Sequence, residues 1–124
     1  VYLGSADESL LPWRPSKKWL TSPEEGRAIP VGRLTVRCLA TPGHTPGGMC
    51  YRVEQGPRDL CFVGDTLFAG SIGRSNPFSL YPLHLESVRR RLLALPSHAV
   101  LLPGHGPATT VAEEVAHNPF GGGS

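Results

Sequence analysis

Residues 33–47, RLTVRCLATPGHTPG, decide how this chain folds. Over residues 33–40 apolar and polar side chains nearly alternate, and a period of two predicts a strand. The apolar members on one side are Leu34, Val36, Cys38 and Ala40. Pro42 ends the strand because proline cannot donate to a sheet ladder, and Gly43 lets the backbone turn sharply. His44 therefore follows a strand end and is expected to project from the sheet edge into the space above it.

The same local frame occurs a second time, and a third strand ends in a similar way. Pro103-Gly104-His105-Gly106-Pro107 follows the apolar segment Ala99–Leu102, which predicts a buried strand. The apolar segment Leu60–Val63 runs directly into Gly64-Asp65-Thr66. Loops that leave neighbouring strands can bring their side chains together, so His44, Asp65 and His105 are predicted to form one cluster.

Two neutral imidazoles and a carboxylate form the kind of ligand set that zinc, iron or manganese use. Taken singly, a histidine after Pro-Gly is more often a loop residue, and the aspartate of Gly-Asp-Thr is more often a turn or helix-cap residue. All three at strand ends favour a metal site. The other histidines, His84, His98 and His117, are interpreted as structural or surface residues.

The rest of the chain predicts a sheet covered by helices on one face. Short strands are expected at Val1–Leu3 and Met49–Val53, with a hairpin turn at Gln55-Gly56-Pro57. A helix over about residues 84–95 is predicted from apolar residues at helical spacing. Thr110-Val111-Ala112-Glu113 is a capping box that opens a last short helix, which Asn118-Pro119 ends. The helical apolar residues are Leu85, Val88, Leu92 and Leu95.

Composition excludes several classes of protein. The chain has 124 residues, with 40% hydrophobic and 18% charged, which is typical of one globular domain. A net charge of +2 gives no indication of a nucleic-acid partner, and Arg89-Arg90-Arg91 is interpreted as the solvated side of a helix rather than a phosphate-binding patch. No apolar run approaches the roughly 20 residues that span a bilayer, so no membrane partner is expected.

Three cysteines without a Cys-x-x-Cys spacing favour a reduced, cytoplasmic setting. Cys38, Cys50 and Cys61 all fall in predicted strands, where cysteine packs as a small apolar residue. Residues 121–124, GGGS, are interpreted as a flexible tail.

Three motifs together resemble the last three metal motifs of the metallo-β-lactamase superfamily. They are Thr41-Pro42-Gly43-His44-Thr45-Pro46-Gly47, then Phe62-Val63-Gly64-Asp65-Thr66-Leu67-Phe68, then Leu102-Pro103-Gly104-His105-Gly106-Pro107. Gly70-Ser71-Ile72-Gly73-Arg74 and Asn118-Pro119-Phe120 are similar to the short members of the glyoxalase II (hydroxyacylglutathione hydrolase) type. The resemblance implies an α/β fold and extends over nearly the whole chain.

One motif of that superfamily is absent from this sequence. Members carry an earlier His-x-His-x-Asp-His motif that supplies further metal ligands, and no two histidines here lie two apart. The resemblance therefore implies that residues 1–120 are the C-terminal βα half of an αββα sandwich. It leaves open whether the chain is a natural half-domain or a fragment.

The resemblance also implies a chemistry and a role for each site residue. The family reaction is attack of a metal-activated hydroxide on a thioester, ester or amide carbonyl, and zinc lowers the pKa of its bound water to about 7. His44 would bind one metal and His105 the other, while Asp65, as the catalytic carboxylate, would bridge them. Zinc is expected, with iron or manganese as alternatives. Arg74 is a weaker candidate for contacting an anionic acyl thioester such as a glutathione conjugate, since it could equally be a surface arginine paired with an acid.

Three functions remain open at this point. The first is a metal-dependent thioester hydrolase that is incomplete without an N-terminal half. The second is a non-catalytic half-domain or fragment that needs a partner half or a second copy of itself. The third is a mononuclear-iron persulfide dioxygenase, which also uses two histidines and an aspartate. Gly64-Asp65-Thr66-Leu67-Phe68 is closer to the hydrolase pattern.

Overall fold

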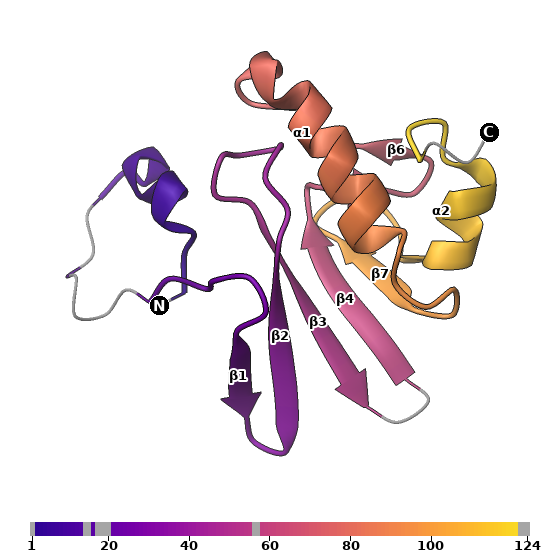
Figure 1. Cartoon of the computed structure of the whole chain (residues 1–124), viewed down its shortest axis with the longest axis horizontal. Helices are drawn as coiled ribbons and strands as arrows, with labels where there is room; N and C mark the ends of the chain where they lie inside the picture. Colours follow the sequence, from indigo (N-terminus) through magenta and orange to yellow (C-terminus); the bar gives the residue numbers. More distant parts are fainter. Residues whose placement is uncertain (1, 14–15, 17–20, 56–57, 122–124) are drawn as a thin grey trace.

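A computed structural model describes residues 2–13, 16, 21–55 and 58–121. Its main element is a sheet with the strand order β1-β2-β3-β4-β7-β8 (Figure 1). These strands are β1 (Ala28–Val31), β2 (Leu34–Ala40), β3 (Met49–Gln55), β4 (Arg58–Gly64), β7 (Val100–Pro103) and β8 (Thr109–Thr110). A separate two-stranded ribbon pairs β5 (Leu67–Phe68) with β6 (Ser71–Ile72). The helical segments are η1 (Ser5–Leu10), η3 (Phe78–Leu80), α1 (Tyr81–Glu86), η4 (Ser87–Leu92) and α2 (Val111–His117).

The centre of the sheet follows the strand predictions. The alternating segment over residues 33–40 forms β2, which pairs antiparallel with β3, and β3 pairs antiparallel with β4. The chain then crosses through α1 and η4 to place β7 parallel to β4. A parallel neighbour requires such a crossover because a tight turn can only join antiparallel strands. The mixed α/β sheet expected from the sequence is confirmed.

Some expected segments are altered in the structure. The predicted strand at Val1–Leu3 is wrong as a strand, because Tyr2 forms only an isolated parallel bridge with Thr21. Parts of three predicted segments lie outside the described residues. They are Val1 of that strand, Gly56 and Pro57 of the hairpin turn, and residues 122–124 of the tail.

The central helix begins and ends earlier than predicted. It starts at Tyr81 rather than residue 84, with Pro82 in its first turn, where a missing N–H costs nothing. From Ser87 to Leu92 it continues as a π-helical segment, and the N–H of Leu93 donates to the carbonyl of Val88 over 2.9 Å. His84, Val88 and Leu92 face inward, and all three are fully buried. No helix in the described part of the chain is long and apolar enough to cross a membrane.

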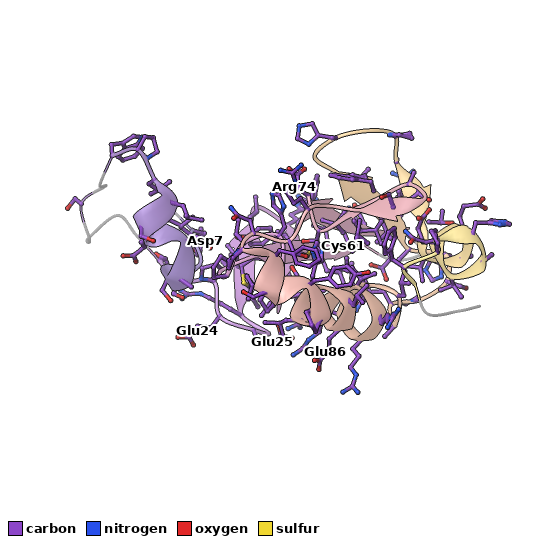
Figure 2. The ribbon with its side chains drawn as sticks, turned by 90° about the horizontal axis from the view of Figure 1, so that it is seen from above. Asp7, Glu24, Glu25, Cys61, Arg74 and Glu86 are labelled. Atoms are coloured by element: carbon purple, nitrogen blue, oxygen red, sulfur yellow. The ribbon has the colours of Figure 1, made fainter. Side chains whose placement is uncertain are left out.

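The hydrophobic core lies between the helices and one face of the sheet. Cys50, Cys61, Val63 and Leu101 come from this face and pack with Val88, Leu92 and Val111 of the helical segments. Cys61 and the other two cysteines are buried free thiols, as predicted for strand positions. Figure 2 shows α1 on one side of the molecule, with Glu86 directed away from the sheet.

The opposite face of the sheet is apolar but less well covered. Cross-strand partners share a face, and the register joins Tyr51 to Phe62 and Phe62 to Leu102. Phe62 keeps 49% of its surface exposed. A strand residue of this size normally buries its ring against a second layer. The face around Phe62 therefore has the character of a packing surface.

Candidate metal centre at the carboxyl edge of the sheet

Strand direction brings the three predicted site residues to one edge. Two successive antiparallel pairings make β2 run in the same direction as β4, and β7 is parallel to β4. The carboxyl ends of all three strands therefore meet at the same edge. His44, Asp65 and His105 lie on the loops that leave these ends.

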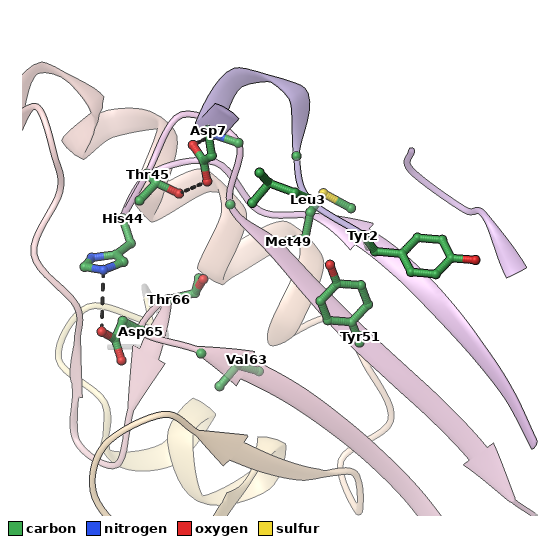
Figure 3. A pocket seen from close by; sticks show the side chains of 14 residues that line it. Tyr2, Leu3, Asp7, His44, Thr45, Met49, Tyr51, Val63, Asp65 and Thr66 are labelled. Atoms are coloured by element: carbon green, nitrogen blue, oxygen red, sulfur yellow. Dashed lines mark hydrogen bonds and ion pairs between the residues drawn. The ribbon is translucent and has the colours of Figure 1, made fainter. Parts of the chain in front are cut away.

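Asp65 lies between the two histidines, and each carboxylate oxygen faces one imidazole. Asp65 Oδ1 is 2.7 Å from Nδ1 of His105. Asp65 Oδ2 is 3.5 Å from Nε2 of His44, and Figure 3 shows these two side chains facing each other. The side chain of Asp65 is 26% exposed, that of His44 36% and that of His105 78%. The cluster is thus open to solvent from the side of His105. The ring of Phe68 meets that of His105 edge to face, with centroids 6.1 Å apart.

A backbone carbonyl fixes the orientation of the His44 ring on the side away from Asp65. Its Nδ1 lies 2.7 Å from the backbone carbonyl of Arg74. A carbonyl oxygen can only accept, so Nδ1 carries a proton, and in the neutral ring Nε2 then presents its lone pair to Asp65. Metal-binding histidines commonly donate their second ring N–H to a carbonyl or carboxylate in this way.

The donor chemistry of the cluster suits a cation. In a neutral ring with the proton on Nδ1, Nε2 of His44 is an acceptor that faces Oδ2 of Asp65 at 3.5 Å, and a cation between the two atoms would satisfy both. His105 and Asp65, by contrast, already hydrogen-bond directly. Among the described residues, no group of three or more His, Cys, Asp or Glu side chains is arranged as a ready metal site. The role of His44, Asp65 and His105 as metal ligands stays a prediction.

His84 is a supporting residue whose importance was not predicted. It is buried beneath the site, where its Nε2–H donates to the carbonyl of Thr66 over 2.8 Å and its Nδ1 accepts from the hydroxyl of Ser75 at 2.9 Å. Burial lowers the pKa of His84, so the ring is held neutral. Thr66 follows Asp65 in the chain, and Ser75 follows Arg74.

The same imidazole contacts the third loop of the site. Gly43, directly before His44, packs so closely that an added Cβ would lie 2.3 Å from Cβ of His84. Gly43 also has a φ of +151°, which L side chains rarely adopt. One buried side chain therefore links the neighbours of His44, Asp65 and Arg74. The sequence did contain a signal for the burial of His84. It lies four residues before Val88, which places it on the buried face of the helix.

The other two histidines lie at the surface, as interpreted from the sequence. His98 is exposed in the loop before β7. His117 is exposed on α2, where Nε2 lies 3.7 Å from a carboxylate oxygen of Glu113.

Arg74 contributes its backbone to the site and exposes its side chain. Its carbonyl orients His44, and the residue also lines a cleft of about 460 Å³ together with Phe78, Tyr81 and Phe120. The rings of Phe78 and Tyr81 stack with centroids 5.6 Å apart. A contact between Arg74 and an anionic substrate stays a prediction.

A second cleft opens beside His44 and Asp65. It has a volume of about 190 Å³ and extends from these residues to Met49 and Tyr51 of β3 and to Asp7 of η1 (Figure 3). The candidate centre therefore adjoins a concave surface on the side of the sheet that carries Tyr51.

Comparison with known proteins agrees with this architecture. The family model of the metallo-beta-lactamase superfamily matches residues 7–105, a range that includes all three site residues. The chain is 42% identical over 91 residues to the probable metallo-hydrolase YqgX of Bacillus subtilis, covering 73% of this chain and 42% of YqgX. It is 35% identical over 98 residues to the hydroxyacylglutathione hydrolase GloC of Haemophilus influenzae, covering 78% of this chain and 45% of GloC.

A solved structure gives the same result in three dimensions. TTHA1623, solved in a di-iron-bound form, superposes with a TM-score of 0.77 at 32% sequence identity, covering 97% of this chain and 64% of that chain. The present chain thus spans under half the length of YqgX and GloC, and about two thirds of TTHA1623. On the family match and the shared fold, the chain belongs to the metallo-beta-lactamase superfamily.

Proposed function

We propose that this chain supplies the C-terminal half of a metal-dependent hydrolase that cleaves a thioester or related acyl bond. The observation that carries the proposal is the arrangement of Asp65, with one carboxylate oxygen toward each of two imidazoles. A carboxylate in this position can bridge two cations, whereas an imidazole nitrogen can bind only one. His44 would hold the first metal and His105 the second.

When bound, the metal would lower the pKa of a water molecule to about 7 and so provide a nucleophile at neutral pH. The residues of this chain would hold and orient the reacting groups. The carbonyl of Arg74 accepts from Nδ1 of His44 and so orients Nε2 toward the site. Zinc is the proposed metal, with iron or manganese as alternatives, and the relative in a di-iron-bound form keeps iron in consideration.

The proposed substrate is a small anionic acyl thioester of the hydroxyacylglutathione kind. The similarity to GloC over 78% of this chain supports this class. The side chain of Arg74 is exposed and the residue lines the cleft with Phe78 and Tyr81, so the proposal assigns its guanidinium to a carboxylate of the substrate. A cation there would raise substrate affinity without taking part in the chemistry.

The proposal includes a partner half. With one imidazole per metal and one shared carboxylate, each cation would have about two protein ligands, fewer than the three that catalytic zinc usually keeps. The exposed Phe62 face offers a surface on which a second sheet could pack. We therefore expect the remaining ligands to come from an N-terminal half or from a second copy of the chain.

The test is a thioesterase assay with the chain alone and with a complementing half. The 124-residue chain is loaded with Zn²⁺ and given S-lactoylglutathione, and loss of the thioester absorbance is followed. Little or no turnover is expected alone, and turnover should appear when the N-terminal half of YqgX is added. His44→Ala should abolish the restored activity, and His117→Ala, a matched change on the exposed face of α2, should retain it.

Three results would count against the proposal. Turnover by the lone chain that His44→Ala removes would show that no partner half is needed. Failure of every complementing half to restore turnover would remove the support for a hydrolase. Oxygen uptake with glutathione persulfide by the iron-loaded, complemented protein would favour the dioxygenase instead.

A further inference from the structure

The η1 segment near the N-terminus packs on the loop that carries His44. Asp7 directs its carboxylate out of η1 and into this loop (Figure 3). Oδ2 accepts a hydrogen bond from the hydroxyl of Thr45 at 2.6 Å, and Oδ1 accepts from the backbone N–H of Gly47 at 2.6 Å. Both oxygens are thus committed to the residues that follow His44.

The contact is close-packed as well as hydrogen-bonded. A Cβ added to Gly47 would lie 2.8 Å from Cγ of Asp7, and one added to Gly4 would lie 2.1 Å from the carbonyl oxygen of Gly47. Backbone therefore meets backbone at Gly4 and Gly47, with no room for a side chain at either position. A contact this tight fixes the distance between η1 and the loop.

Asp7 acts on the side of the loop that follows His44, and the loop also has hydrogen bonds within its own backbone. The N–H groups of Gly43 and Gly48 both donate to the carbonyl of Thr45, at 3.0 and 3.2 Å, and the N–H of Thr41 donates to the carbonyl of Gly48 at 2.9 Å. Other elements anchor the residues before His44, because the N–H of Asn76 donates to the carbonyl of Gly43 over 3.2 Å and the hydroxyl of Ser87 donates to the carbonyl of Pro42 over 2.7 Å. Asp7 anchors the residues after His44, and the carbonyl of Arg74 holds the His44 ring itself.

We propose that Asp7 is a positioning residue for His44, which places this histidine at the metal through Thr45 and Gly47. The inference rests on the proposed metal-dependent function. Its geometric core, the control of His44 orientation by Asp7, is measurable without metal. A carboxylate suits this role because its two oxygens can accept two hydrogen bonds at once. Here the donors are a hydroxyl and an N–H that lie two residues apart in the loop.

The experiment compares Asp7→Ala and Asp7→Asn with two controls in the full chain. Asparagine can accept from Gly47 and donate to the Thr45 oxygen, so it should keep the link. Glu8→Ala removes the same charge from the exposed neighbouring position of η1. Thr110→Ala removes the N-cap of α2 and lowers stability far from the loop.

Two readouts are taken for each protein. The first is the affinity for Co²⁺ in the presence of the complementing N-terminal half, followed by the visible absorption spectrum of the bound ion. The second is the tautomer of the His44 ring in the metal-free protein at pH 8, read from long-range ¹H–¹⁵N correlations. The wild type should show a single Nδ1–H tautomer, held by Arg74.

Asp7→Ala is expected to weaken Co²⁺ binding about tenfold or more, the effect typical of losing support around a metal ligand. It should also replace the single tautomer by a mixture. Asp7→Asn should stay within about threefold of the wild type, and both controls should match the wild type in both readouts.

The outcomes separate this inference from the proposed function. No Co²⁺ binding by the wild type would remove the metal-site proposal. The tautomer measurement would still test whether Asp7 controls the orientation of His44. A wild-type tautomer and wild-type Co²⁺ affinity in Asp7→Ala would overturn the positioning role. So would an equal loss of affinity in Thr110→Ala, because general destabilisation would then explain the effect.

Discussion

Replacing His84 with alanine should be among the most damaging single changes in this protein. The substitution removes two buried hydrogen bonds and leaves the carbonyl of Thr66 and the hydroxyl of Ser75 without their partner. A buried polar group that loses its partner costs about 1–3 kcal/mol. The vacated ring volume adds a cavity term, so the free energy of unfolding should fall by about 3–5 kcal/mol.

The assay is thermal unfolding followed by circular dichroism at pH 8. For a chain of this size 1 kcal/mol corresponds to a shift of roughly 3–5 °C, so His84→Ala should lower the midpoint by about 10–20 °C. His84→Gln can still donate to the carbonyl of Thr66 and should recover about half of the loss. His117→Ala serves as the matched control, because that side chain is 71% exposed, and should leave the midpoint unchanged.

The pH dependence gives a second check on the same residue. Burial lowers the pKa of His84, so between the ordinary value of about 6.5 and its folded value the unfolded chain binds more protons than the folded one. The stability from His84 is therefore complete above pH 6.5 and is lost as the pH falls below it. His84→Gln should be less sensitive between pH 8 and 5.5. A loss below about 1 kcal/mol for His84→Ala, or equal pH slopes for wild type and His84→Gln, would refute the reasoning.

Three further predictions address other parts of the molecule. The hydrogen bond from Arg52 lowers the pKa of Asp59, and Asp59→Asn breaks this buried ion pair. The substitution should therefore lower the free energy of unfolding by about 2 kcal/mol at pH 7, measured by urea unfolding. Its difference from the wild type should begin to shrink below about pH 4, where unfolded Asp59 becomes protonated, and should vanish once the pH falls below the lowered pKa of the folded carboxylate; a pH-independent difference would contradict this. Thr110→Ala removes the side-chain acceptor for the N–H of Glu113 and should cost about 1 kcal/mol in the same assay, while no change would mean that the cap is not formed in solution. Phe62→Lys should reduce self-association of the wild-type chain in sedimentation velocity, and a wild type that stays monomeric at all concentrations would argue against a packing surface there.

The central strands were predictable because their signals are local. Alternation over residues 33–40 and the apolar segments at 60–63 and 99–102 needed no tertiary information. β1 was missed because Pro30 argues against a strand, yet proline is tolerated here because β1 is an edge strand paired only with β2. β5, β6 and β8 have two residues each, too few for any periodicity to appear.

The site was predictable only in part, for a related reason. His44, Asp65 and His105 each follow a strand signal in the sequence, so their placement at one edge could be inferred. The contacts of Asp7 reach 38 and 40 residues along the chain, and those of His84 reach back 18 residues to Thr66. No local sequence pattern predicts contacts of this kind, because tertiary packing determines which loops the side chains of Asp7 and His84 contact.

The parallel pairing of β4 with β7 has a consequence for the order of folding. β2, β3 and β4 are joined by short connections and can pair early, whereas β7 must close a long loop through α1 and η4 before it meets β4. His105 reaches Asp65 only after that closure, while His44 and Asp65 lie on segments that are already joined. We therefore expect the complete donor set to assemble late, after the transition state of folding. A metal that needs all three side chains should therefore slow unfolding and leave the folding rate nearly unchanged.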